Sequence, residues 1–332
     1  MEKGWERELQ VELQPDELER MLSPAFPGRQ LAEAALLTKG LANTNIRFRL
    51  EGDVGAYVLR INTREPEAAR REQALMSHIA AHAGPAIPVA PLVHSHPWDE
   101  QGYAYSIWGF VDGVLLEDLF ETLPPSQLVD IAGECGTVLA AIASQRRFER
   151  CGELGPGLAV GREYGPPSAF VPSMIERGLF AGRAGRRLGT ALRDELWRVV
   201  ERVLPMLGAI DDRYALVHAD YKRSNILMRR SGPGWAVAAV LDWEFAFAGP
   251  PIVDVGVFLR AGEALPDGFR EAFAASYRAA GGELPPDWLP LSRLVDLVNQ
   301  IIFLDDPRDR PQVFAETTAI VQETLRLLAS LA

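Results

Sequence analysis

The stretch LVHADYKRSNILM, residues 216–228, brings together side chains suited to acid–base and metal chemistry. It places His218, Asp220 and Asn225 within eight positions, with Lys222 between them, and Asp242 follows at the end of the next predicted strand. A carboxylate beside a hydroxyl group can accept its proton, whereas an amide oxygen and a second carboxylate are hard ligands that suit Mg²⁺. Phosphoryl transfer uses this combination of groups.

The spacing of these residues matches one catalytic pattern better than another. Protein-kinase-type enzymes carry H-x-D-x-x-x-x-N in their catalytic loop and a metal-binding aspartate in the next hairpin, and HADYKRSN at 218–225 has that spacing. A dinuclear metallohydrolase is the competing class of enzyme, but it needs several histidines around two metal ions. Only His218 lies near the carboxylates in the sequence, so the pattern favours a kinase.

The surrounding segments predict a β-rich first part and a helical second part. Strands are expected at 46–50, 57–61 and 103–108, where β-formers alternate with polar residues, and one helix that begins at Pro66 and ends before Gly84 interrupts them. After Gly113 the periodicity predicts helices at 126–144, 190–208, 268–280, 290–304 and 313–331. Two short strands, 215–217 and 236–241, flank this stretch. Because Asp220 and Asn225 follow the first strand and Asp242 ends the second, these three side chains are expected to lie close together.

Composition limits the partners of the chain. The formal net charge of -11 repels the phosphates of nucleic acids and anionic lipid heads, which excludes both as expected partners. The sequence shows no signal-peptide-like start and no 18-residue apolar run, and its 2 cysteines are too few for a disulfide framework, so we expect a soluble cytoplasmic protein that handles small molecules. The oligomeric state is left open.

Two long segments resemble a known family. LVHADYKRSNILM and the later VLDWEFAFAGPPIVDVG look like the aminoglycoside phosphotransferase family, which includes choline and homoserine kinase relatives of the protein-kinase fold. KGLANTNIRF resembles its nucleotide loop, YVLRI its third strand, RREQALMSHI its paired-glutamate helix and SIWGFVDG its hinge, so the likeness extends from Lys39 to Gly256. The resemblance implies an α+β, protein kinase-like two-lobed fold, with a sheet lobe at 1–110 and a helical lobe at 111–332.

The same resemblance implies a role for each matching residue. Asp220 is expected to be the catalytic base, with Lys222 against the transferring phosphate, and Asn225 and Asp242 are expected to bind Mg²⁺. For ATP or GTP, Arg60 is expected to bind the phosphates and to pair with Glu72. Gly109 and Val111 are expected to contact adenine as hinge residues, and Leu227 to lie beneath it. His218 and Asp254 are expected to support the loop.

Two departures from the family pattern concern residues expected to bind the phosphates of the nucleotide. The phosphate loop GLANTN has a single glycine, Gly40, so Asn43 and Thr44 are expected to supply its contacts. Arginine stands at the third-strand position, Arg60, where protein kinases have lysine; it keeps the charge but has a different shape. A nucleotide-binding module without turnover therefore remains an alternative to the kinase.

The acceptor is the part of the function that the sequence constrains least. From Leu241 onwards, 14 Asp and Glu residues stand against 7 Arg, which favours a cationic acceptor such as an aminoglycoside. The side chains expected to pair with its amines are Asp296, Asn299, Asp305, Asp306 and Asp309. The arginine run at 177–187 is interpreted as a solvated connector, or as an anion-binding flap, which would favour a neutral or anionic metabolite. Another small hydroxylated molecule, such as a sugar, homoserine or choline, is the alternative acceptor.

Overall fold

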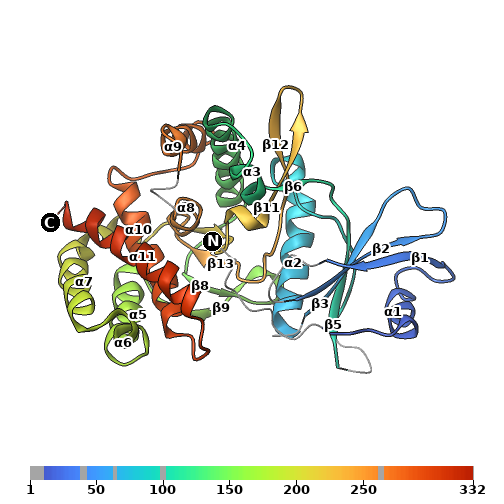
Figure 1. The fold of residues 1–332 in the computed structure, drawn as a ribbon, viewed down its shortest axis with the longest axis horizontal. Helices are drawn as coiled ribbons and strands as arrows, with labels where there is room; N and C mark the ends of the chain where they lie inside the picture. Colours follow the sequence, from blue (N-terminus) through green and yellow to red (C-terminus); the bar gives the residue numbers. More distant parts are fainter. Residues whose placement is uncertain (1–10, 38–42, 63–65, 98–101, 261–264, 332) are drawn as a thin grey trace.

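Alternating apolar and polar residues build the sheet of the smaller lobe in the computed structural model, which describes residues 11–37, 43–62, 66–97, 102–260 and 265–331. Five antiparallel strands pair in the order β1-β2-β3-β5-β4 (Figure 1). Their bounds are β1 Leu31–Leu36, β2 Thr44–Leu50, β3 Tyr57–Asn62, β4 Leu92–His96 and β5 Ala104–Gly109. The strands predicted at 57–61 and 103–108 are neighbours in this sheet, as the kinase-like fold requires.

Along β3, successive side chains face opposite sides of the sheet. Leu59 and Ile61 are fully buried in a small core with Leu18 and Met21 of helix α1 (Pro15–Leu22). Arg60, between them, points to the opposite face, where helix α2 (Pro66–His82) lies. The predicted helix is therefore present, and it meets the face of the sheet that carries Arg60.

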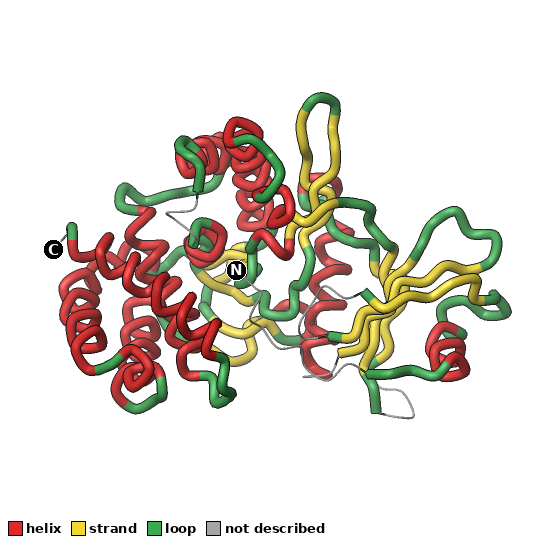
Figure 2. Tube along the Cα trace, in the orientation of Figure 1, coloured by secondary structure: helices red, strands yellow, loops and turns green. Residues whose placement is uncertain are grey.

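Helices make up most of the larger lobe, and Figure 2 shows them gathered on the side away from the five-stranded sheet. The predicted helices are present as α4 Pro125–Ser144, α7 Thr190–Val203, α9 Phe269–Ala279, α10 Trp288–Asp305 and α11 Pro311–Ala329. The last part of the segment predicted at 190–208 is instead a 3-10 helix, η3 Leu204–Ile210. The other helices are α3 Leu116–Phe120, α5 Pro167–Phe180, α6 Ala184–Leu188 and α8 Ile252–Phe258, with 3-10 turns η1 Gly84–Ala86, η2 Pro156–Leu158 and η4 Arg223–Asn225.

Most of the run 177–187 lies on α5 and α6 and not in an irregular connector, although Arg177, Arg183 and Arg186 are exposed, as expected for a solvated run. Arg187 donates to the main-chain oxygens of Leu304 (2.5 Å) and Asp306 (2.7 Å) at the end of α10, and its guanidinium lies 3.7 Å from the ring centroid of Phe314. Asp305 accepts the main-chain N–H of Arg183. These contacts tie the run to α10 and α11.

Short strands between the helices flank the stretch 218–225. One sheet has the order β7-β10-β13-β8-β9 and another the order β12-β11-β6. Their bounds are β6 Val114–Leu115, β7 Arg147–Phe148, β8 Gly152–Leu154, β9 Val160–Glu163, β10 Tyr214–Val217, β11 Ile226–Ser231, β12 Gly234–Val240 and β13 Phe247–Gly249. The two predicted strands, now β10 and β12, lie in different sheets.

Among the described residues, α4 is the one helix long and apolar enough by composition to cross a membrane. Its apolar side chains belong to the large core: Leu128, Ile131, Cys135 and Leu139 are buried. α4 packs closely on α9, since a Cβ added at Gly136 would stand 2.5 Å from the main-chain oxygen of Phe273. The helix is therefore a core helix of the larger lobe.

Candidate active site

The stretch that follows β10 is held in place by one buried carboxylate. Asp254, on α8, accepts the main-chain N–H groups of His218 and Ala219, each at 2.7 Å. Ala219 has φ +68°, a left-handed conformation that alanine rarely adopts, so these two bonds stabilise a strained turn. Burial raises the pKa of the Asp254 carboxyl to about 7, although the two N–H donors act against this shift.

His218 links this turn to the end of β12. Its Nδ1 accepts the main-chain N–H of Asp220 at 3.2 Å, and its Nε2 lies 3.0 Å from the main-chain oxygen of Leu241. Burial lowers the pKa of this imidazole to about 4, so the ring is neutral and donates through Nε2. The histidine thus occupies a bracing position between the two segments that carry Asp220 and Asp242.

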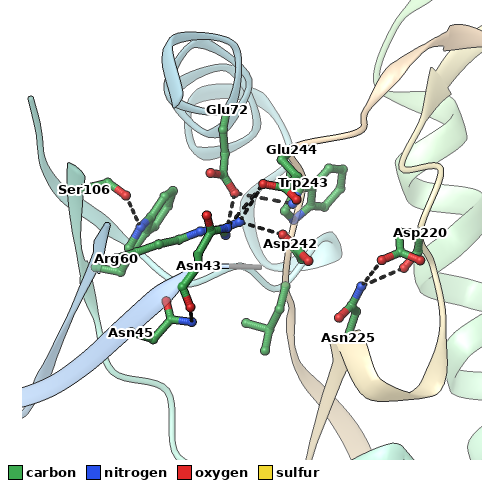
Figure 3. Close-up of polar contacts among 12 residues, drawn as sticks. Asn43, Asn45, Arg60, Glu72, Ser106, Asp220, Asn225, Asp242, Trp243 and Glu244 are labelled. Carbon is green, nitrogen blue, oxygen red and sulfur yellow. Dashed lines mark hydrogen bonds and ion pairs between the residues drawn. The ribbon is translucent and has the colours of Figure 1, made fainter. Parts of the chain in front are cut away.

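Asp220 and Asn225 lie against each other (Figure 3). The Nδ2 of Asn225 donates to Oδ2 of Asp220 at 2.8 Å and to its main-chain oxygen at 3.0 Å. Lys222 places its Nζ 3.2 Å from the same Oδ2. Burial raises the pKa of the Asp220 carboxyl, while the Lys222 charge acts to lower it. A carboxylate in this setting is a better proton acceptor than a solvated one.

Arg60 is the centre of a cluster of carboxylates between the two lobes (Figure 3). Its guanidinium lies 3.2 Å from Glu72, 2.7 Å from Asp242 and 3.2 Å from Glu244. Burial alone lowers the pKa of Arg60, but the three carboxylates outweigh burial and raise it. Burial raises the pKa of Asp242, but the Arg60 charge and hydrogen bond outweigh it, so that carboxyl titrates below its usual range.

Glu244 is the residue of this cluster that sequence reasoning missed. Its carboxylate is buried, contacts Arg60, and accepts the Nδ2 of Asn43 at 3.3 Å. Its signal in the sequence was weak, namely an acidic residue two positions after Asp242. Glu244 joins a segment beside Asp242 to the segment before β2, across a sequence separation of 201 residues.

The residues expected to contact the phosphates differ in how they are placed. Asn43 faces Arg60 and Glu244, as Figure 3 shows. Thr44 is buried, and its hydroxyl accepts the main-chain N–H of Val11 at 2.9 Å, so this side chain makes its hydrogen bond within the smaller lobe. Gly40 lies outside the described residues. Of the two, only Asn43 therefore points toward the carboxylate cluster.

The expected hinge residues follow the end of β5. Gly109 donates its N–H to Pro91 at 2.8 Å, and a Cβ at this position would lie 2.7 Å from the Pro91 ring, so the crowding favours glycine. Val111 follows, half-buried, where the chain passes into the larger lobe. Leu227 pairs with Leu115 across the β11–β6 ladder and is half-buried, whereas its neighbours Ile226 and Met228 are buried. The chain therefore brings Leu227 beside the segment that follows Val111.

Most of the acidic side chains expected to bind amines are engaged within the protein. Asp296 is 2% exposed, and the guanidinium of Arg260 donates two hydrogen bonds to its carboxylate, of 2.9 and 2.7 Å. It also accepts bonds from Asn299 and Gln300. Asp306 accepts bonds from Arg308, and Asp305 accepts a main-chain N–H; Asp309 is exposed.

Two oxygen donors suit a hard cation. The amide nitrogen of Asn225 is held by Asp220, which leaves its amide oxygen, and Asp242 adds a carboxylate. Mg²⁺ is commonly held by one or two such groups together with substrate phosphates. Among the residues that the structure describes, no group of three or more His, Cys, Asp or Glu side chains could hold a metal ion.

Comparison with known families agrees with this geometry. The model of the phosphotransferase enzyme family matches residues 33–291, so the chain belongs to that family, and the predicted phosphotransferase class is confirmed. A comparison with curated protein sequences found no match.

Solved structures with the same fold include several small-molecule kinases. An aminoglycoside phosphotransferase solved with GDP and kanamycin is 17% identical with a TM-score of 0.69, over 93% of this chain and 98% of that one. A choline kinase from Streptococcus pneumoniae is 12% identical with a TM-score of 0.59, over 93% and 98%. A spectinomycin phosphotransferase solved with ADP and spectinomycin is 12% identical with a TM-score of 0.57, over 96% and 98%. The predicted α+β, kinase-like two-lobed fold is confirmed.

Proposed function

We propose that the protein is a Mg²⁺-dependent kinase that transfers the γ-phosphate of ATP or GTP to a hydroxyl group of a small molecule. The observation that carries this proposal is the position of Asp220 and Asn225 beside Asp242, which Arg60 joins to the nucleotide-binding sheet. Similar structures solved with GDP and with ADP support a nucleotide as donor.

Each group has a separate task in this reaction. Asp220 accepts the proton of the acceptor hydroxyl, helped by burial that raises its pKa. Lys222, 3.2 Å from that carboxylate, supplies positive charge beside the transferring phosphate. A magnesium ion held by Asn225 and Asp242 neutralises phosphate charge when bound. Arg60, fixed by Glu72 and Glu244, is positioned to grip the phosphates of the nucleotide.

For the acceptor we favour a neutral or anionic hydroxylated molecule. A polycationic acceptor needs free carboxylates, but Asp296 is neutralised by Arg260 and Asp306 by Arg308. An aminoglycoside or choline-like acceptor is the second candidate, because similar structures include enzymes solved with kanamycin and spectinomycin and a choline kinase.

A coupled assay of nucleotide consumption tests the proposal. ATP and GTP are each offered with Mg²⁺ against sugars, homoserine, choline and a panel of aminoglycosides. We expect turnover that requires both Mg²⁺ and an uncharged or anionic acceptor, with phosphate recovered on that acceptor. Turnover with aminoglycosides or choline alone would replace our choice of acceptor by the second candidate. Nucleotide binding without turnover on any acceptor would indicate a binding module instead.

A further inference from the structure

Three carboxylates share one guanidinium at the junction of the two lobes (Figure 3). The Nη1 of Arg60 donates to Glu72 at 3.2 Å. Its Nη2 donates both to Asp242, at 2.7 Å, and to Glu244, at 3.2 Å. Both terminal nitrogens of the guanidinium are therefore engaged by carboxylates.

Glu244 is the more buried of the two carboxylates that share Nη2. Its side chain is 8% exposed, against 29% for Asp242, which also feels the charge of Lys222. The Oε2 of Glu244 accepts the Nδ2 of Asn43 at 3.3 Å as well as the bond from Arg60. Separating a buried carboxylate from its guanidinium is costly, because an uncompensated charge is left in the interior. Glu244 therefore ties Arg60 to the larger lobe, while Asp242 stays accessible to solvent.

The donor of Arg60 that remains is Nε. This nitrogen is buried and has no hydrogen-bond partner in the part of the chain that the structure describes. A guanidinium offers five donors in a fixed plane, whereas the ammonium of lysine offers three donors from a single nitrogen. A lysine at this position would use its three donors on the three carboxylates, whereas arginine satisfies them and keeps one donor.

We propose that Glu244 is a positioning residue that makes arginine, and not lysine, necessary at position 60. The carboxylates of Glu72, Asp242 and Glu244 hold the terminal nitrogens of Arg60, and Nε is left to donate a charge-assisted bond to a phosphate oxygen of the nucleotide. This inference rests on the proposed function, because it takes a nucleotide as the ligand of Arg60. It does not require turnover.

A double-mutant cycle of Arg60→Lys and Glu244→Gln tests this role, by calorimetric titration of the full chain with ADP and with GDP in the presence of Mg²⁺. We expect Arg60→Lys to bind the nucleotide about tenfold more weakly, because the carboxylates take up the ammonium donors. Glu244→Gln alone should change the affinity by no more than about threefold. In the Arg60→Lys protein it should restore the affinity to within about threefold of the native value, since one competing carboxylate is gone.

The matched control is the pair Arg213→Lys and Glu283→Gln, which makes the same two changes at an exposed ion pair of 2.9 Å in the larger lobe. Neither control variant should change the affinity for nucleotide. A role that is only structural would appear in thermal unfolding and not in the non-additive change of nucleotide affinity.

An equal effect of Glu244→Gln in the arginine and lysine backgrounds would overturn the proposal, because it would show a general effect of charge. Weaker binding in both backgrounds would also overturn it and would indicate that Glu244 holds the metal ion. Native affinity in Arg60→Lys, or no nucleotide binding by the native protein, would likewise contradict it.

Circular dichroism shows whether each variant is folded. A lysine variant that folds only together with Glu244→Gln would support the proposal, and failure of both lysine variants to fold would overturn it. A protein that binds nucleotide but transfers no phosphate would refute the kinase reaction and leave the outcome of the cycle unaffected.

Discussion

At the scale of single residues, Asp220 is the side chain on which the proposed chemistry depends. Asp220→Asn keeps an oxygen that can accept from the Nδ2 of Asn225, so the loop geometry should persist, but the amide cannot accept a proton. We expect the catalytic rate to fall by about 10²–10⁴-fold, while nucleotide affinity changes by no more than roughly twofold. Steady-state kinetics and nucleotide titration measure the two quantities.

The control for this variant is Asp212→Asn, which makes the same change at an exposed position before β10. It should leave both quantities unchanged. Full turnover by Asp220→Asn with the true acceptor would contradict the role of general base, whatever the acceptor proves to be.

At the scale of elements, the contact between α4 and α9 depends on the absence of a side chain at Gly136. A Cβ there would lie 2.5 Å from the main-chain oxygen of Phe273 and 3.2 Å from the main-chain nitrogen of Tyr277, and main chain cannot move aside as a side chain can. Gly136→Ala should therefore lower the free energy of unfolding by about 1–3 kcal/mol, although alanine favours a helix. Urea unfolding measures this change.

Gly208→Ala is the matched control, because a Cβ at Gly208 meets no atom within 4 Å. It should be neutral or slightly stabilising. A loss of stability in Gly208→Ala as large as in Gly136→Ala would show that the effect belongs to the substitution and not to the helix contact.

At the scale of the whole molecule, helix α2 joins the smaller lobe to the large apolar core, although the five-stranded sheet also has a small core of its own with α1. Leu75, Met76 and Ile79 of α2 belong to the same buried cluster as residues of α4, α8 and α10 of the larger lobe. Arg60 adds ion pairs from β3 to Asp242 and Glu244. We therefore expect one cooperative unfolding transition, because separation of the lobes would expose the buried face of α2 and break the ion pairs of Arg60.

Calorimetry and tryptophan fluorescence test this expectation. A single calorimetric transition should coincide with the change in fluorescence and with the loss of helical circular dichroism. Two separate transitions would show that the lobes unfold independently. The division at residues 110 and 111 remains a prediction from the sequence.

The sequence alone was sufficient for the features that depend on neighbours along the chain. Helical periodicity located α2, α4, α10 and α11 within a few residues, and alternation located β2, β3 and β5. The spacing from His218 to Asn225 indicated phosphoryl transfer, because a loop of eight residues brings its own side chains together. Each of these depends on contacts within a few turns of chain.

Only the tertiary structure decided the features that depend on distant partners. Glu244 became part of the site because folding places it beside Arg60, 184 residues away in the sequence. Asp296 looked available for a cationic acceptor until the structure paired it with Arg260. The two- and three-residue strands β7 and β13 pair on either side of β10, and β13 also pairs with β8, so these short strands depend on partners far away in the sequence. Local sequence patterns do not predict such partners. The free energy that favours these contacts arises from burial and charge pairing between segments that are far apart in the sequence.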